Sequence, residues 1–135
     1  MPMEEELRIN QIKETCLYVA DLARTEQFYA ETLNLPLIGK SPGRHVFFRA
    51  GASVLLCFNS AITANDEHLP PHDGVGRLHF AWEVPSEQYD AWKKFITEKE
   101  IVIEKEVLWR KSIKSFYFRD PDKHLLEIVT PGLWG

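Results

Sequence analysis

The sequence predicts an α+β fold in which two βαβββ modules form curved sheets around a cup, with the helices outside. One observation is that two stretches share a plan of aromatic strand, Phe-Arg pair, short turn and apolar strand, at residues 46–58 and 116–129. A second is that the strands preceding the two predicted helices, residues 14–19 and 79–84, also match. Because this long repeat occurs only twice, it indicates a duplicated module and not a solenoid.

The first module spans residues 9–60 and begins with a strand at 12–19. Asp21 is a good N-cap for the helix that follows, since its carboxylate accepts hydrogen bonds from the free N–H groups of the first turn. We expect this helix to run to about residue 33, where Asn34 and Pro36 end it. Three further strands are predicted, at 35–38, 44–50 and 53–59.

Residues 61–75 read as a linker with little periodicity, rich in proline and glycine. The second module, 76–131, repeats the order of the first. Its helix should start at Ser86 as N-cap and bury Tyr89, Trp92 and Ile96, which are spaced for one helix face. Its predicted strands lie at 77–84, 101–108, 115–119 and 124–129, with an Asp-Pro-Asp turn at 120–122 and a C-terminal tail whose Trp134 should pack against the protein.

Composition favours a single domain covering residues 1–135, with 44% hydrophobic residues to build a core. The formal net charge of −4 argues against a nucleic-acid-binding protein, which normally needs a basic face. No apolar run approaches the ~20 residues of a membrane span, and no leader follows Met1, so we expect a cytoplasmic protein. Cys16 and Cys57 lie within predicted strands and should be buried free thiols.

Glu127 lies in the middle of the apolar strand of residues 125–129. A buried carboxylate costs several kcal/mol unless something compensates its charge, and a metal ion is one such compensation. A partner arginine, or a side chain that faces solvent, would also explain it.

Strand alternation tests which residues share a face with Glu127. In the strand from residue 77, Phe80, Trp82 and Val84 form an apolar face for the helix, so His79 points to the opposite face, which we call the cup face. Glu14, His79 and Glu127 then occupy three of four repeat-matched positions, and Leu56 occupies the fourth. The alternatives are a hydrogen-bonded structural histidine and an exposed glutamate at the start of a strand.

One imidazole and two carboxylates leave about three positions open on a six-coordinate ion for water or a bidentate substrate. This mixed nitrogen and oxygen set suits one divalent ion per site, either zinc, manganese, iron or nickel. The same alternation places Tyr117 on the cup face.

The chain resembles the vicinal oxygen chelate superfamily, which includes glyoxalase I, bleomycin-resistance proteins, fosfomycin-resistance enzymes and extradiol dioxygenases. The resemblance extends from Ile12 to Trp134. It is carried by Tyr18-Val19-Ala20-Asp21-Leu22, by Phe28-Tyr29 and Leu33-Asn34-Leu35, by the strand around His79, and by Asp120-Pro121-Asp122 leading to Glu127.

The resemblance implies that Glu14, His79 and Glu127 bind a divalent metal and that Tyr117 lines the metal pocket as a hydrogen-bond donor or acid. A core aromatic with a satisfied hydroxyl is the alternative for Tyr117. Two departures stand out. Glu14 occupies a position that is commonly histidine, and Leu56 replaces an acidic residue of glyoxalase I-like members, which counts against that activity.

By this resemblance we expect a metal-dependent lyase, isomerase or dioxygenase that acts on a small substrate chelated through two oxygens. A non-catalytic binding protein of the bleomycin-resistance type is the alternative. Family members of this size are usually C2 homodimers, so Glu14 of one chain would join His79 and Glu127 of the other. A monomer whose two modules close on each other is also possible.

Overall fold

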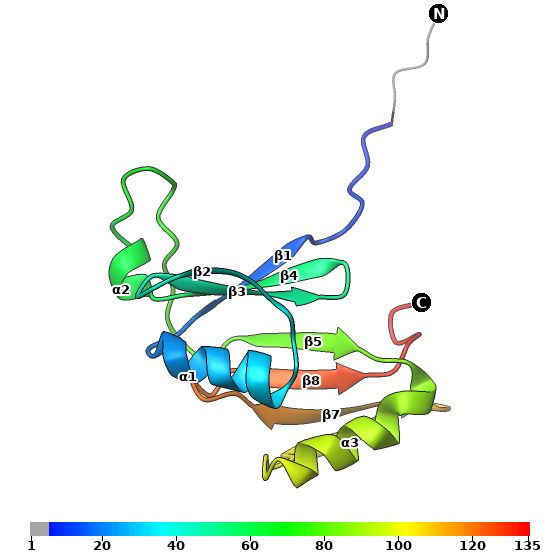
Figure 1. Cartoon of the computed structure of the whole chain (residues 1–135). Coiled ribbons are helices and arrows are strands. Elements are labelled where there is room, and N and C mark those ends of the chain that lie inside the picture. Colours follow the sequence, from blue (N-terminus) through cyan, green and yellow to red (C-terminus); the bar gives the residue numbers. More distant parts are fainter. Residues whose placement is uncertain (1–5) are drawn as a thin grey trace, which may run out of the picture.

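The computed structural model describes residues 6–135 as two four-stranded sheets with short helices beside them (Figure 1). The first module contains β1 (Glu14–Tyr18), α1 (Leu22–Glu26), η1 (Gln27–Thr32), β2 (Leu37–Ser41), β3 (His45–Ala50) and β4 (Ser53–Phe58). The linker contains α2 (Ser60–Thr63). The second module contains β5 (His79–Glu83), η2 (Ser86–Gln88), α3 (Tyr89–Glu98), β6 (Lys105–Arg110), β7 (Ile113–Arg119) and β8 (Leu125–Val129).

The two sheets have the same topology and the same register, which confirms the predicted repeat. Their strand orders are β1-β4-β3-β2 and β5-β8-β7-β6, and in each sheet the first strand runs parallel to the last. Cys16 lies beside Leu56 in the first sheet, as Ala81 lies beside Glu127 in the second. Glu14 and His79 are each two residues earlier on their strands, so they occupy matched positions.

The first helix begins as predicted, because the Asp21 carboxylate accepts a hydrogen bond from the N–H of Arg24 at 3.1 Å. The helix continues as the π-helix η1 and ends where Asn34 takes a left-handed conformation with φ of 62°. Asparagine tolerates this conformation better than most residues, which explains why the helix stops there.

Several predicted boundaries in the chain were wrong. Ser86 does not cap the second helix; it opens the 3-10 turn η2, and Gln88 precedes α3 without a side-chain cap. The strand expected at 101–108 is β6 at Lys105–Arg110, because Ile101 instead closes the end of α3 by donating its N–H to the Ile96 carbonyl at 3.2 Å. The strand expected at 35–38 is β2 at Leu37–Ser41.

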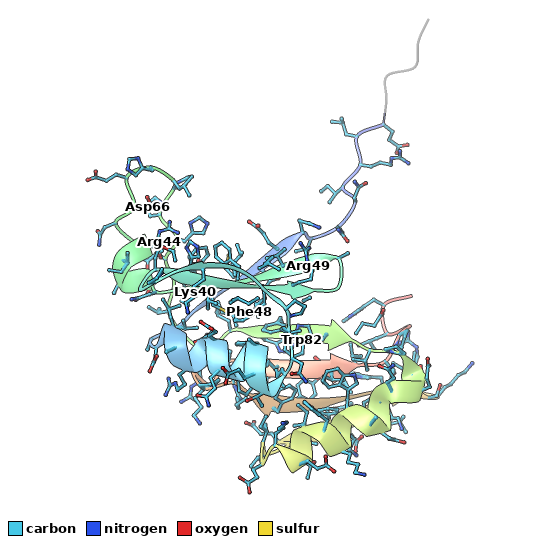
Figure 2. All side chains as sticks on the ribbon, in the orientation of Figure 1. Lys40, Arg44, Phe48, Arg49, Asp66 and Trp82 are labelled. Carbon is cyan, nitrogen blue, oxygen red and sulfur yellow. The ribbon has the colours of Figure 1, made fainter. Side chains whose placement is uncertain are left out.

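One hydrophobic core joins the two modules, and each sheet contributes its helix-side residues to it. The cluster includes Leu17 of β1 together with Phe118 and Ile128 of the second sheet. Tyr29 of η1 is fully buried between the sheets, with its ring centre 5.5 Å from that of Phe48 and 6.2 Å from that of Trp82. Phe48 and Trp82 are labelled in Figure 2. Because side chains alternate along a strand, both cup faces point away from this shared core.

The last tryptophan and the apolar residues of the first described segment are exposed. Trp134 is 95% exposed, so the expectation that it packs is wrong for a single chain. Leu7 and Ile9 are also exposed, in an extended segment that projects from β1 (Figure 1). Across residues 6–135, no helix has the length and apolar character needed to cross a membrane.

Both cysteines are free thiols, as predicted. Cys57 is fully buried, whereas Cys16 is only partly buried, on the cup face of β1. Burial and then the nearby Glu14 carboxylate raise the pKa of Cys16, so this thiol is protonated at neutral pH.

Candidate functional site

His79 and Glu127 lie together on the cup face of the second sheet. Nε2 of His79 is 3.2 Å from Oε1 of Glu127, on parallel neighbouring strands. The Glu127 side chain is 8% exposed and that of His79 is 46% exposed, so the pair borders the open surface. No arginine lies within ion-pair distance of Glu127 among the described residues, and the side chain at that distance is His79.

The backbone fixes which imidazole nitrogen faces the carboxylate. Nδ1 of His79 is 2.7 Å from the carbonyl oxygen of Leu125, and a carbonyl only accepts, so Nδ1 carries the proton and donates it. If Nδ1 carries the only proton, Nε2 presents a lone pair to the Glu127 carboxylate. Two lone pairs at this separation repel unless a proton or a cation lies between them.

This arrangement fits a divalent metal ion. Two ligands about 2.1 Å from one ion and at right angles to each other are about 3 Å apart, close to the observed separation of Nε2 and Oε1. A metal-bound histidine usually donates its other N–H to a carbonyl or a carboxylate, as His79 does to Leu125. Sequence reasoning missed the Leu125 carbonyl, because a backbone acceptor leaves no signal in the residue types.

Tyr117 is next to this pair, as alternation predicted. It lies directly opposite Glu127 in the β7–β8 ladder, and its ring centre is 6.2 Å from that of His79. Burial raises the pKa of the Tyr117 hydroxyl; the Ser115 hydroxyl opposes this change and the Glu127 carboxylate adds to it. The hydroxyl therefore keeps its proton at neutral pH and can donate a hydrogen bond.

Glu14 is not brought to the other two candidate ligands within one chain. It is exposed at the start of β1, on the cup face of the first sheet, beside Val54. Within residues 6–135 no group of three or more His, Cys, Asp or Glu side chains is placed to hold a metal ion. A single chain thus presents His79 with Glu127 on one sheet and Glu14 on the other.

Two hollows of the surface lie away from His79 and Glu127. A hollow of about 510 Å³ separates α1 from the β2–β3 hairpin, and one of about 640 Å³ lies between the modules beside Trp82 and Trp92. Neither hollow is lined by His79 or Glu127. A single chain does not enclose the candidate site in either of them.

Four basic residues near the starts of strands or loops, Arg44, His45, Lys111 and Lys114, have different surroundings. Arg44 forms an ion pair with Asp66 of the linker (Figure 2) and donates to Nδ1 of His45 at 2.6 Å. Lys114 lies over the Tyr89 ring, 4.8 Å from its centre, and Lys111 is exposed in the β6–β7 turn. His45 faces the cup side of β3, since it lies opposite Phe58 and Tyr18 lies beside Phe58.

Comparison with known proteins identifies the family. A family model described as the Glyoxalase/Bleomycin resistance protein/Dioxygenase superfamily matches residues 8–128. The chain belongs to this superfamily. The predicted resemblance and the paired-module fold are confirmed.

Relatives within the superfamily include enzymes. The chain is 26% identical to metallothiol transferase FosB of Staphylococcus epidermidis over 127 residues, which are 92% of this chain and 84% of FosB. The solved lactoylglutathione lyase from Agrobacterium tumefaciens superposes with a TM-score of 0.88 and 33% identity, covering 95% of this chain and 98% of the lyase. FosX from Listeria monocytogenes, a fosfomycin resistance protein complexed with Mn(II) and sulfate, gives a TM-score of 0.70 at 22% identity, covering 93% and 94% of the two chains.

Proposed function

We propose that this superfamily member is a divalent-metal-dependent enzyme acting on a small substrate that chelates the metal through two oxygens. The observation that carries the proposal is the His79–Glu127 pair, in which the Leu125 carbonyl engages Nδ1 and leaves Nε2 of His79 3.2 Å from a carboxylate oxygen. The Mn(II) in the FosX structure supports a divalent ion. Zinc, manganese, iron and nickel all suit the proposed ligands His79, Glu127 and Glu14.

When bound, the ion would supply Lewis-acid stabilisation of an enolate-like or oxyanion-like state. The residues of the chain have separate roles. The Leu125 carbonyl holds the His79 ring in one tautomer, and the Glu127 carboxylate contributes negative charge. Tyr117 holds a proton on its hydroxyl next to Glu127, so it is the candidate catalytic residue that donates to a substrate oxygen as negative charge develops there.

We further propose that the site is completed by a second copy of the chain, in a C2 homodimer. The cup faces of one chain point away from its shared core, so Glu14 reaches the ion only from a partner copy. Closing both cup faces within one chain would require separating the sheets around Tyr29. The exposed Trp134 and the exposed apolar residues of the extended first segment are available for such an interface.

The reaction type is a choice between lyase, isomerase, dioxygenase and transferase chemistry. The names of two relatives, metallothiol transferase and lactoylglutathione lyase, both include a thiol or thiol adduct, which makes such substrates the first to assay. The second candidate function is sequestration without chemistry, as in bleomycin-resistance proteins. It is favoured by Leu56, which puts an apolar side chain at the position that matches Glu127.

Metal analysis tests the proposal. Protein purified without chelator should contain about one divalent ion per chain by inductively coupled plasma mass spectrometry, as expected for a full ligand set. His79→Ala and Glu127→Ala should each lose the ion, because each removes one of two ligands held on the same sheet.

Glu83→Ala is the matched control. Glu83 shares the cup face and β5 with His79, but it is four residues further along, about 13 Å at ~3.3 Å per residue. It should therefore keep the ion. Wild-type protein that holds no divalent ion and takes none up would exclude the enzyme proposal, and loss of metal from Glu83→Ala would show that the assigned residues are wrong.

A further inference from the structure

The cup face of the first sheet carries a cluster of aromatic rings, which we call the aromatic box. Its members are Tyr18, His45, Phe47, Phe58 and His72. Tyr18, Phe58 and His45 lie side by side across β1, β4 and β3, and Phe47 is two residues from His45 on β3. Glu14, the proposed metal ligand on this face, lies four residues before Tyr18 on β1.

The rings are stacked with defined geometry. His45 is parallel to Phe47, with ring centres 4.0 Å apart and an angle of 7° between the planes. His72 stacks on Phe58 at 4.6 Å, and Tyr18 stacks on the same ring at 6.4 Å. Phe58 is 3% exposed and forms the floor, whereas the other four rings are partly exposed around it.

The linker forms one wall of the box. The backbone of His72 exchanges hydrogen bonds with Thr63, the last residue of α2. Nδ1 of His72 is buried and has no hydrogen-bond partner among the described residues, so stacking and backbone contacts hold the ring. Gly74 packs so closely on Tyr18 that a Cβ there would come 2.5 Å from the Tyr18 ring.

His45 adds a polar group at the edge of the box. Burial and then the positive charge of Arg44 lower the pKa of His45, so the ring is neutral at pH 7. Arg44 donates to Nδ1, which leaves the proton on Nε2. This Nε2–H has no partner within residues 6–135, and it suits an acceptor on a ligand.

We propose that the aromatic box binds a planar aromatic or heteroaromatic group of the substrate, about 7 to 13 Å along the sheet from Glu14, the proposed metal ligand on this face. This inference rests on the proposed function, because the distance is measured from Glu14. Leu56 and Phe47 are two residues along the strands from the Glu14 row, and Tyr18 is four residues along β1. Glu14 and the aromatic box lie on the same sheet of one chain, so the distance between them is the same in a monomer and in a dimer.

A pair of hydroxamates tests the box, since both chelate through two oxygens and only one carries rings. We expect zinc-loaded protein to bind biphenyl-4-hydroxamate about tenfold more tightly than acetohydroxamate in calorimetric titrations. Phe47→Leu and Tyr18→Leu should each weaken binding of the biphenyl compound by about fivefold and leave acetohydroxamate unchanged. Phe95→Leu, the same change on α3 outside the cup, should alter neither affinity.

A probe without a chelating group separates this proposal from the metal proposal. Saturation-transfer NMR with 4-phenylphenol on metal-free protein should give a signal that both box variants reduce and Phe95→Leu does not. A protein that fails to hold metal but shows this result would lose the enzyme proposal and keep the ring site. Equal losses for both hydroxamates, no preference for the biphenyl compound, or the same loss with Phe95→Leu would each exclude the aromatic box as a ring site.

Discussion

Among single residues, the Arg44–Asp66 ion pair connects the linker to β3. Asp66 also accepts hydrogen bonds from the backbone N–H groups of His68 and Leu69, at 3.0 and 3.4 Å. The Arg44 hydrogen bond and then the His68 N–H lower the pKa of Asp66 to about 2. This carboxylate therefore organises the loop that ends at His72, a wall of the aromatic box.

The Asp66 pKa predicts a pH dependence of stability. Because the folded value is below the unfolded value of about 3.9, the ionised carboxylate stabilises the folded protein above pH ~4, and this contribution is lost as the pH falls towards 2. Asp66→Asn should lower the urea midpoint at pH 6, and the difference from wild type should shrink between pH 4 and pH 2.

Glu67→Gln is the control for this measurement, since Glu67 is the exposed neighbour and has no ion-pair partner among the described residues. Its urea midpoint should follow that of wild type across the same range. A difference between Asp66→Asn and wild type that stayed constant from pH 6 to pH 2 would contradict the assignment.

Between elements, the Asp-Pro-Asp turn joins the two modules. Asp120 accepts from the Tyr29 hydroxyl at 2.7 Å and from the N–H groups of Asp122 and His124. His124 accepts from the Leu78 N–H at Nδ1 and therefore donates from Nε2 to the Tyr18 carbonyl, at 3.0 Å. The turn that sequence reasoning predicted thus also fixes η1 and β1 to the second sheet.

Tyr29→Phe should destabilise the protein by about 1 to 3 kcal/mol, because it leaves a buried carboxylate oxygen of Asp120 without its donor. Tyr89→Phe is matched to it: the Tyr89 hydroxyl donates to Glu106 at 2.6 Å, but Glu106 is exposed and keeps Lys93. Urea unfolding should show a clearly smaller loss for Tyr89→Phe. Equal losses would mean that the Tyr29–Asp120 contact does not stabilise the joint between the modules.

Local patterns predicted the elements well and their ends less well. Alternation and the repeat gave the correct faces for His79, Tyr117 and Glu127, because a strand has only two faces. The same patterns wrongly placed a strand at Ile101 and Ile103, because two apolar residues spaced by two are typical of a strand. In the structure both side chains pack on the core in the loop that follows α3. Ser86 does not cap the second helix because it lies inside the 3-10 turn η2, where Pro85 occupies the N-cap position.

For the whole molecule, sequence predicted which residues share a face but not which faces meet. Side-chain alternation places Glu14 and Glu127 on cup faces, and this holds in the structure. It contains no information on whether two cup faces close within one chain. The structure joins the modules through their helix sides, so the three candidate ligands are divided between two sheets that face away from each other.

In the proposed C2 dimer, one metal site takes Glu14 from one chain and His79 with Glu127 from the other. Mixing two variants that each lack one proposed ligand, Glu14→Ala and Glu127→Ala, tests whether the site is shared between chains. The two proteins would be unfolded together, refolded with zinc and analysed for bound metal, next to each variant refolded alone. Subunit exchange would be confirmed by mass spectrometry of differently tagged chains.

With shared sites, each heterodimer contains one site that has Glu14, His79 and Glu127 intact and one site that lacks both Glu14 and Glu127. The mixture should therefore regain tight binding of about one zinc ion per heterodimer, while each variant alone binds none tightly. If confirmed heterodimers bound no more zinc than the separate variants, the proposal that Glu14 joins His79 and Glu127 across the dimer would be wrong.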